Sequence, residues 1–543
     1  MKNITEKFLW VFAFFLVAVA YLFGLFVDLT GDSGLYAAIS RQMVESGDWF
    51  NLKINGMPYD QKPHLFFWLA GLGIKFFGNT NFAFKLFPFL YGAAGVYFTY
   101  RLGRQIYSEE TGKLAALILG TSQIFFLYFF DFHTDSVLQT GVVLALWQLA
   151  AYLQSQKPIN FVLGFFGVGL AMLSKGPIGA VLPFLAVFFY LLAERDFKQL
   201  FHPKWILGIL IVLAVISPSL IHLYKNFGFE GIKFFFITNN VGRITGSYAG
   251  SSTDYFYAIH TILWAFLPWT IFVAAALFST VKDWFLRKPN LKWSYYLMGG
   301  VFILLLILTV AKGKAPNYFL IAVAPISVVA ASWLTRLATF SVKFQRRVLC
   351  TQIIFVGILL VFFSVLVYIF REDGIWGSAL FTILFIIIFP RIKWLRKPLL
   401  VNSLLLSVLV LGGINLFLNA HVLPKLFAYQ GARQVLKLYD ENSSSESKLY
   451  NLSIEEYALF FYAGQRVENI EKWDELRLAL SKPGAWIYAN EIDYKEILFQ
   501  KLPIDTVYFI EQRGMNRVNL TFLNPKTRET ALKTNYLIVS KRK

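Results

Sequence analysis

Acidic and basic side chains occur together in short polar segments that separate long apolar runs. The longest such segment, residues 28–64, reads DLTGDSGLYAAISRQMVESGDWFNLKINGMPYDQKPH and contains Asp32 and Lys62. Later polar segments contribute Asp135, Lys175, Arg243 and Tyr318. A carboxylate can take the proton of a hydroxyl acceptor. Lysine, arginine and a tyrosine hydroxyl can stabilise a departing phosphate. If the substrate is a sugar carried on a lipid phosphate, these residue types supply what its transfer to a hydroxyl needs.

Each of these residues also has a purely structural interpretation. Asp32 and Asp135 each stand at the start of a helical pattern, where a carboxylate commonly caps free backbone N–H groups. Lys62 could be a snorkelling lysine whose stem lies along apolar surface. Tyr36 could be an interfacial anchor, and His133 a polar boundary residue. The residues taken singly are weak signals, so the argument depends on their joint placement.

The segment around Asp32 predicts an interfacial helix. With helical spacing, residues 33–45 have one apolar face and one polar face. The two faces consist of Leu35, Ile39 and Met43, and of Arg41, Gln42 and Glu45. Such a helix is expected to lie at the surface of a membrane.

The elements that must position the polar segments are apolar runs of membrane-spanning length. The chain of 543 residues is 57% hydrophobic and 15% charged, whereas soluble domains contain about 25% charged residues. Runs of roughly 20 residues, the length that crosses a bilayer, recur about thirteen times. They fall near 7–27, 82–100, 112–130, 137–154, 159–173, 177–193, 204–222, 256–280, 295–311, 317–335, 349–370, 376–390 and 398–418. The first run has no small-residue cleavage site after it, which predicts a retained helix. The single cysteine, Cys350, excludes internal disulfides.

The cations predict one orientation for all the runs. With the N-terminus in the cytoplasm beside Lys2 and Lys7, every second loop is rich in lysine and arginine, as the positive-inside rule requires. These loops hold Arg101, Arg104, Lys113, Arg195, Lys198, Lys204, Lys282, Arg287, Lys288, Lys292, Arg336, Lys343, Arg346, Arg347, Arg391, Lys393, Arg396 and Lys397. The net charge of +19 is then mainly an orientation signal, and we expect no nucleic-acid partner. The sequence predicts a multi-pass protein of a bacterial-type inner or plasma membrane.

This topology places the polar segments and the chain end on the outer face. Ionisable groups at a membrane surface are costly and usually face a functional cavity. After residue 425 the chain becomes polar, with the serine-rich stretch YDENSSSESK and alternating stretches such as AWIYANE, DTVYFIEQ and NYLIVSK. We predict a small α/β domain over 430–543, in the periplasm or outside the cell.

An ordered set of motifs carries a family resemblance. The set consists of GDSGLYAAISRQMVESGDW, NGMPYDQKPHLFFWL, HTDSVL, LSKGP, FLPW and KAPNYFLIAVAP. Residues 7–420 resemble the integral-membrane C-type (GT-C) glycosyltransferases that use polyprenyl-phosphate sugars. The likeness is greatest to the lipid A aminoarabinose transferase and protein O-mannosyltransferase branch. It implies an all-α polytopic membrane domain over 1–425, with interfacial helices in the first outer loop, about 28–78.

The resemblance also implies roles for the polar residues. Asp32 would be the acceptor-side base of an inverting transfer, and Asp135 would position the acceptor or orient the base. Lys62 and Arg243 would bind the donor phosphate, and Lys175 and Tyr318 would line the same cavity. Further candidates for the cavity are Tyr36, Tyr59, His64 and His133.

Two departures from the family pattern bear on metal and acceptor. The aminoarabinose enzymes usually have Glu-Lys-Pro-Pro where this chain has Gln61-Lys62-Pro63-His64, and their glutamate is linked to a metal site that uses a histidine of a later outer loop. The segment 225–254 contains no histidine. We therefore predict no metal ligands and no cofactor, with a divalent metal as the alternative. Protein mannosyltransferases usually have an Asp-Glu pair where this chain has Asp32-Ser33, so the acceptor stays open between lipid A, a surface glycan and a protein.

Two other functions share part of this pattern. A transporter or flippase of lipid-linked sugars would also need cations on the outer face. Transporters, however, typically have internal repeats and binding sites near the bilayer midplane. A polymerase or ligase of surface glycans would differ only in its acceptor.

Overall fold

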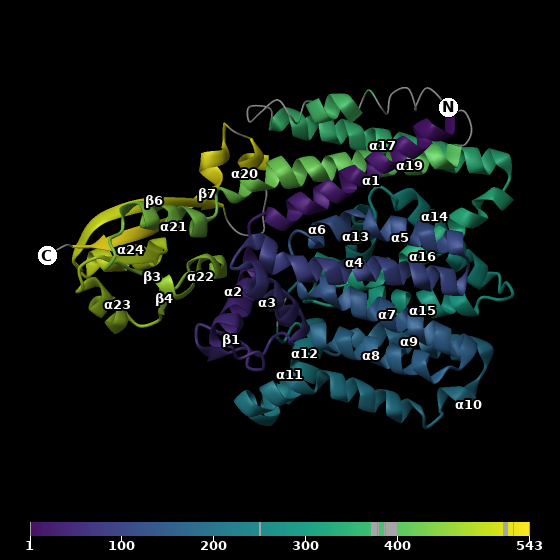
Figure 1. Cartoon of the computed structure of the whole chain (residues 1–543), viewed down its shortest axis with the longest axis horizontal. Helices are drawn as coiled ribbons and strands as arrows, with labels where there is room; N and C mark the ends of the chain where they lie inside the picture. The colour runs from purple at the N-terminus through teal and green to yellow at the C-terminus, as the bar shows by residue number, and fades with distance from the viewer. Residues whose placement is uncertain are drawn as a thin grey trace.

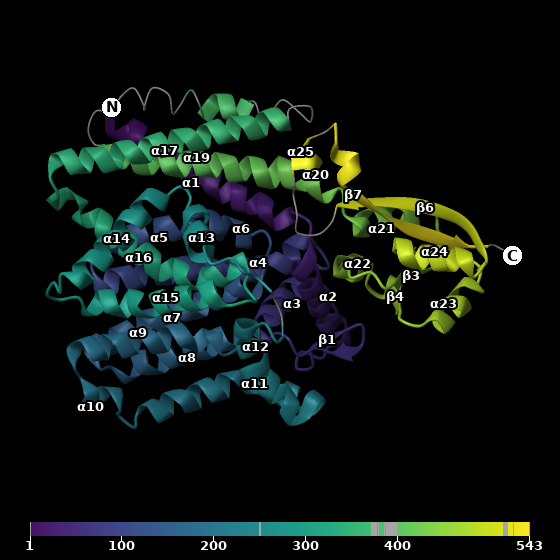
Figure 2. The same cartoon turned by 180° about the vertical axis from the view of Figure 1, so that it is seen from behind.

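The helices form one large bundle with a small α/β domain at one end (Figure 1). The computed structural model describes residues 2–248, 251–370, 377, 379–384, 386, 399–513, 520–524 and 526–541. Helix α1 (Lys2–Phe26) begins at the end of the bundle farthest from this domain (Figure 1). The view from behind shows the same arrangement (Figure 2).

Long apolar helices make up most of the bundle. Within the described ranges, nine helical segments are long and apolar enough to cross a membrane. They contain α1, α4 (Asn81–Ile106), α7 (Thr134–Ser155), α8 (Pro158–Lys175), α11 (Trp205–Lys233), α15 (Lys292–Val310), α16 (Leu320–Arg336), α17 (Val342–Ile369) and α19 (Leu399–Phe417). The predicted all-α polytopic membrane fold is confirmed.

Three predicted runs are not single long helices. Run 112–130 consists of α5 (Glu109–Gly120) and α6 (Gln123–Tyr128), and run 177–193 is the shorter α9 (Ile178–Glu194). Run 256–280 consists of α13 (Tyr257–Ala265) and α14 (Thr270–Phe285). Pro268 separates the last two, because proline lacks the N–H that a continuous helix needs. About half of run 376–390 lies outside the described residues.

A buried lysine joins α4 to the end of α1. The side chain of Lys85 is fully buried, and its Nζ donates hydrogen bonds to the carbonyls of Gly24 (3.1 Å) and Val27 (2.6 Å). The last carbonyls of a helix lack intrahelical partners and carry the negative end of its dipole. These carbonyls therefore accommodate the Lys85 cation inside an apolar run. The contact fixes the point at which α1 ends and the first loop begins.

The first loop contains the predicted amphipathic helix. It folds into α2 (Gly31–Ser46), the short strands β1 (Lys53–Ile54) and β2 (Met57–Pro58), and α3 (Leu65–Phe77). Ile39 and Met43 are buried while Glu45 is exposed, as the spacing predicts. The residue before α2 is Thr30, which occupies the N-cap position, and Asp32 lies inside the first turn. The interpretation of Asp32 as the cap is therefore wrong.

The C-terminal domain is built on a five-stranded sheet in the order β4-β3-β5-β7-β6. Its strands are β3 (Lys448–Leu452), β4 (Val467–Ile470), β5 (Ala485–Ala489), β6 (Ile504–Arg513) and β7 (Leu532–Ser540). Its main helices are α21 (Gly431–Asn442), α22 (Tyr457–Ala463), α23 (Trp473–Leu480) and α24 (Glu491–Phe499). Strands β4, β3 and β5 are parallel, and β7 is antiparallel to both of its neighbours. The predicted linker YDENSSSESK is shorter than expected, because its first four residues complete α21.

The C-terminal domain holds the first loop through α22. Helix α2 approaches α22 so closely that a Cβ on Gly34 would lie 2.9 Å from the backbone nitrogen of Ala458. The Tyr462 hydroxyl accepts the Leu29 N–H (3.0 Å) and lies within hydrogen-bond distance of Asp28 and Asn81. Figures 1 and 2 both show α2 beside α22. The domain therefore braces the segment that carries Asp32.

We expect Tyr462→Phe to weaken this brace. The change leaves the Leu29 N–H and the Asn81 Oδ1 without the Tyr462 hydroxyl as partner, which costs about 1–3 kcal/mol for buried polar groups. Thermal unfolding in detergent should show a lower midpoint, and limited proteolysis should release the C-terminal domain faster. Tyr457→Phe removes a hydroxyl from the same helix but none of these bonds, so it serves as the control. Equal behaviour of the two variants would contradict the brace.

Candidate active site

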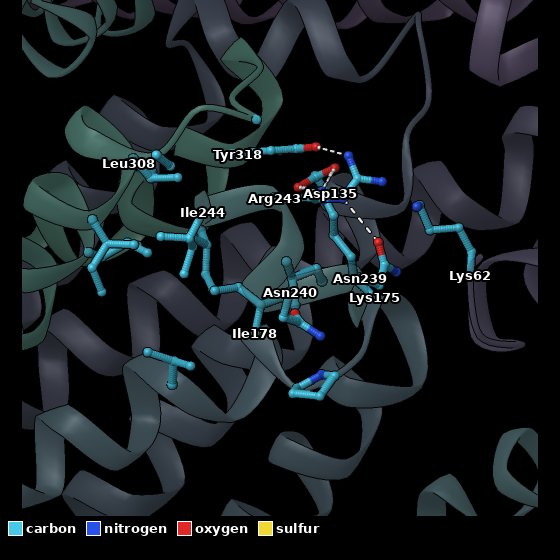
Figure 3. A pocket seen from close by; sticks show the side chains of 18 residues that line it. Lys62, Asp135, Lys175, Ile178, Asn239, Asn240, Arg243, Ile244, Leu308 and Tyr318 are labelled. Carbon is cyan, nitrogen blue, oxygen red and sulfur yellow. Dashed lines mark hydrogen bonds and ion pairs between the residues drawn. The ribbon is translucent and has the colours of Figure 1, made fainter. Parts of the chain in front are cut away.

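Five of the predicted residues line one cavity of about 240 Å³ (Figure 3). The polar lining consists of Lys62, Asp135, Lys175, Asn239, Asn240, Arg243 and Tyr318. The apolar lining includes Leu138, Ile178, Val181, Ile244, Leu304, Ile307, Leu308 and Ile321. In Figure 3 the labelled apolar residues Ile178, Ile244 and Leu308 lie on the side away from Lys62. The cavity thus has a charged end and an apolar wall.

Two helix ends bring opposite charges together at this site. Asp135 lies in the first turn of α7 and Lys175 in the last turn of α8, where the helix dipole favours an anion and a cation respectively. The helices pack closely, since a Cβ on Gly141 would lie 2.6 Å from the backbone nitrogen of Ala171. This packing lets charges that are far apart in the sequence meet.

Asp135 is fully engaged by its neighbours. Its carboxylate oxygens lie 2.5 and 2.6 Å from the Lys175 Nζ, and Asn317 Nδ2 donates a third bond of 2.7 Å. Only 2% of Asp135 is exposed. The carboxylate therefore orients a cation at the cavity wall instead of standing free to take a proton.

Arg243 is fixed on α12 (Asn239–Thr245) by several contacts. Its guanidinium donates to the Tyr318 hydroxyl (2.9 Å) and to Asn239 Oδ1 (3.0 Å). The Tyr318 ring, on the short helix η2 (Pro316–Phe319), also lies 4.1 Å from the Lys175 Nζ in a cation–π contact. Arg243, Tyr318 and Lys175 thus form one connected group at the charged end.

Lys62 approaches the same group from the loop between β2 and α3. Its ammonium makes one long hydrogen bond, 3.3 Å to the Gln61 carbonyl. Desolvation, together with the charges of Lys175 and Arg243, lowers the pKa of Lys62 to about 7. A cavity end in which cations depress the pKa of a lysine favours an anionic ligand, because an anion would relieve this repulsion.

Asp32 lies beside the cavity and does not line it. Its side chain is 61% exposed, and its Oδ2 atom lies 3.5 Å from the Tyr36 hydroxyl and 3.7 Å from the His133 Nδ1. The negative charge of Asp32 raises the pKa of Lys62, against the larger opposing effects, and that of the buried Tyr36. Asp32 is therefore an accessible carboxylate next to the charged end, where an incoming acceptor could reach it.

None of the four further cavity candidates, Tyr36, Tyr59, His64 and His133, lines this cavity. Tyr59 and His64 have a different place. The buried His64 ring lies 2.7 Å from Ser219 Oγ on α11 and 3.0 Å from the Phe50 carbonyl. Burial lowers the pKa of His64 to about 4, so the ring is neutral. The Tyr59 carbonyl lies 2.9 Å from the His222 Nε2, also on α11. Both residues fasten the loop that carries Lys62 to α11.

The sequence interpretation missed several polar partners in the site. Asn317, which bonds Asp135, stands in the quoted motif KAPNYFL, so its place beside Tyr318 was a usable signal. Asn239 and Asn240 follow an apolar stretch without any distinctive pattern. The sequence interpretation also assigned no role to Asp131. This carboxylate accepts a hydrogen bond from Ser33 Oγ at 2.5 Å.

Metal binding has little support from the geometry. In the part of the chain that the structure describes, no group of three or more histidine, cysteine, aspartate or glutamate side chains could hold a metal ion. The rings of His64 and His222 lie 5.4 Å apart, yet each has a nitrogen close to a loop carbonyl. The absence of a cofactor stays a prediction.

The chain is similar to several known proteins. Residues 61–222 match the family described as dolichyl-phosphate-mannose-protein mannosyltransferase. The chain is 27% identical over 487 residues to an uncharacterized protein of Aquifex aeolicus. This match covers 89% of this chain and 92% of that protein. The chain is also 27% identical to the undecaprenyl phosphate-alpha-4-amino-4-deoxy-L-arabinose arabinosyl transferase of Edwardsiella ictaluri, and this match spans 60% of this chain and 59% of the transferase.

A solved structure shares the whole fold. The crystal structure of ArnT from Cupriavidus metallidurans bound to undecaprenyl phosphate superposes with a TM-score of 0.78 at 18% identity. It covers 99% of this chain and 99% of that chain. The apo structure of the same protein gives a TM-score of 0.75 at 19% identity. At this identity the likeness establishes a common fold, including the C-terminal domain.

Proposed function

We propose that this chain, an integral-membrane glycosyltransferase of the C-type fold, transfers a sugar from a polyprenyl-phosphate carrier to a hydroxyl or phosphate acceptor, with inversion. The observation that carries the proposal is the two-part cavity. Its charged end, with Lys62, Lys175 and Arg243, suits a phosphate, and its apolar wall suits the start of a polyprenyl chain. The resemblance drawn from the ordered motifs is confirmed by the family match and the transferase relatives.

The cavity residues would act mainly on the leaving group. Breaking the bond between the sugar and the phosphate converts a phosphodiester with one negative charge into a phosphomonoester with two. Fixed cations aimed at this developing charge lower the barrier without reorganisation. Lys62, Arg243 and Lys175 would supply the charge, and Tyr318 a further hydrogen bond.

Asp32 would act on the acceptor. An acceptor hydroxyl that attacks the sugar carbon must lose its proton, and a positioned carboxylate can take it. Asp32 is exposed beside the charged end, so an acceptor can approach from solvent while the donor phosphate lies behind it. Attack from the face opposite the departing phosphate would invert the sugar carbon. Asp135, held by Lys175 and Asn317, would keep the cation group in place.

The transferase interpretation is favoured over the transporter interpretation. A transporter would typically bind its cargo near the midplane, between internal repeats. Here the polar lining comes from helix ends and loops at the end of the bundle nearest the C-terminal domain, and the named relatives are transferases. An accessible carboxylate next to phosphate-binding cations has a direct use in transfer, as the base for the acceptor hydroxyl.

The proposed orientation has the N-terminus in the cytoplasm and the C-terminal domain in the periplasm or outside the cell, in an inner or plasma membrane. The cation-rich loops support it through the positive-inside rule. The start of α1 and the C-terminal domain lie at opposite ends of the bundle (Figure 1), which agrees with it. Among acceptors, lipid A comes first because the ordered motifs resemble the branch that contains the lipid A aminoarabinose transferases, followed by a surface glycan and then a protein.

The first experiment compares the surface molecules of cells with and without the gene. Mass spectra of lipid A and of released glycans would be recorded for a deletion strain, and for the strain complemented with wild type or with Asp32→Asn. We expect the mass of one sugar to vanish on deletion and to return only with wild type. Full restoration by Asp32→Asn would contradict the role of Asp32 and favour the transporter.

A further inference from the structure

A histidine lies between two carboxylates at the edge of the site. The His133 Nδ1 is 3.7 Å from Asp32 Oδ2, and its Nε2 is 3.3 Å from Asp131 Oδ2. Asp131 uses its other oxygen to accept the Ser33 hydroxyl at 2.5 Å. The set therefore links the first turn of α2 to the loop before α7, with the imidazole in the middle.

The surroundings of His133 hold its ring in one orientation. The ring packs edge-on against Tyr36 and Tyr128, with ring centroids 6.3 and 5.6 Å apart, and the side chain is only 16% exposed. An ionised Asp131 accepts a hydrogen bond from Nε2–H, which assigns the proton of the neutral ring to Nε2. The Nδ1 lone pair is then left facing Asp32.

The charges around the ring make it a better base than an ordinary imidazole. Burial opposes the charged form, but Asp131, Asp32 and Asp135 together raise the pKa of His133. Against the desolvation of Asp131, the charge and hydrogen bond of His133, the hydrogen bond of Ser33 and the charge of Lys85 lower the pKa of Asp131. Tyr36 and Tyr128 both face the ring. Burial raises the pKa of Tyr36, so it does so as a neutral phenol. Near neutrality an imidazole holds a proton more tightly than a carboxylate does.

We propose that His133 receives, through Asp32, the proton that the acceptor hydroxyl loses in the transfer. This proposal rests on the proposed function. As the sugar carbon bonds to the acceptor oxygen and its bond to the phosphate breaks, the acceptor proton moves to Asp32 and then to Nδ1 of His133. The imidazolium later releases it to solvent, while the lipid phosphate leaves as a dianion. Asp131 is the positioning residue that fixes the tautomer.

The relay predicts a particular pH dependence. Below the pKa of His133 the ring already carries its proton and cannot receive another, so transfer should decline on the acid side. Asp131→Asn removes a neighbouring charge, which typically moves a pKa by about 1–3 units. It should therefore move this decline to lower pH. If Asp131 had only a structural role, Asp131→Asn would lower the transfer rate but leave the pH of the acid-side decline unchanged.

The test combines a titration with kinetics on the full-length protein in detergent. Histidine NMR titration, with His133→Gln to assign the signal, should place the pKa of His133 above the usual range. It should also show the pKa falling in both Asp131→Asn and Asp32→Asn. A His133 signal that ignores both substitutions overturns the relay.

The kinetic arm uses undecaprenyl-phosphate 4-amino-4-deoxy-L-arabinose as donor and lipid A as acceptor. We expect His133→Gln to slow transfer by about 10²-fold at pH 7.5 and to abolish the decline near the pKa of His133. His260→Gln, which changes an exposed histidine beside Asp254, is the control. If wild type transfers the sugar and the pH profiles of the His133 and Asp131 variants match that of wild type, the relay fails while the proposed function stands. If wild type transfers neither this sugar nor any sugar mass found in the cell comparison, the proposed function fails and the relay with it.

Discussion

Replacing Asp32 by asparagine is expected to slow sugar transfer by about 10²–10⁴-fold, the usual contribution of a general base. The amide keeps the size of the side chain and its place in the first turn of α2 but cannot accept a proton. Because Thr30 and not Asp32 occupies the N-cap position, the helix should lose only the dipole interaction, about 0.3–1 kcal/mol. The variant should therefore fold and still bind undecaprenyl phosphate.

The measurement is the rate of product formation by purified protein, followed by mass spectrometry under single-turnover conditions. Glu230→Gln is a matched control, since it removes a carboxylate from α11 that is 76% exposed and pairs only with Lys233 in the described structure. A thermal midpoint within a few degrees of wild type would show that Asp32→Asn remains folded. Retained transfer by Asp32→Asn would remove the base from the mechanism. Loss of lipid-phosphate binding would instead place Asp32 in donor recognition.

The membrane architecture could be predicted because it follows from length and hydropathy. A run that must cross a bilayer has to satisfy its backbone groups internally and expose apolar side chains, so most runs map onto helices. The breaks within runs 112–130 and 256–280 depend on local choices that hydropathy does not encode. Pro268 gave a local signal for the second break, whereas Thr121 and Ser122, which separate α5 from α6, gave none of comparable strength.

The site could be predicted only as a collection of residue types. Lys62, Asp135, Lys175, Arg243 and Tyr318 line one cavity, as the topology suggested by placing their segments on one face. The specific pairs were beyond the sequence, because the bond between Asp135 and Lys175 depends on how α7 and α8 pack. The same limit explains His64. Its position two residues after Lys62 predicts a cavity residue, whereas in the fold its ring packs against Ser219 of α11.

Binding of undecaprenyl phosphate is expected to weaken above pH 7, by up to about tenfold per pH unit. The free protein has a Lys62 with a pKa of about 7, so its ammonium loses the proton as the pH rises through that value. A bound phosphate stabilises the ammonium, so binding must take up a proton above pH 7. Measurements between pH 7 and 9 avoid the titration of the phosphate monoester itself, whose second pKa is about 6.

Two substitutions separate this effect from general electrostatics. Lys62→Arg keeps a charge at every pH of the experiment, so its affinity should be nearly flat over the range where wild type weakens. Lys62→Met should bind weakly at every pH and slow transfer by about 10²–10³-fold, as the loss of one stabilising group at a developing anion does.

Lys233→Met is the control, because it removes an exposed lysine of α11 outside the cavity and should keep the slope of wild type. Isothermal titration in buffers of different ionisation enthalpy would count the protons taken up. Uptake near one proton at pH 8 in wild type, and near zero in Lys62→Arg, is the expected result. Equal proton uptake by wild type and Lys62→Arg would show that the group taking up the proton is not Lys62 but another group in the site. In that case Lys62 would be a permanently charged ligand of the phosphate, and its neighbours Lys175 and Arg243 would not depress its pKa as their placement implies.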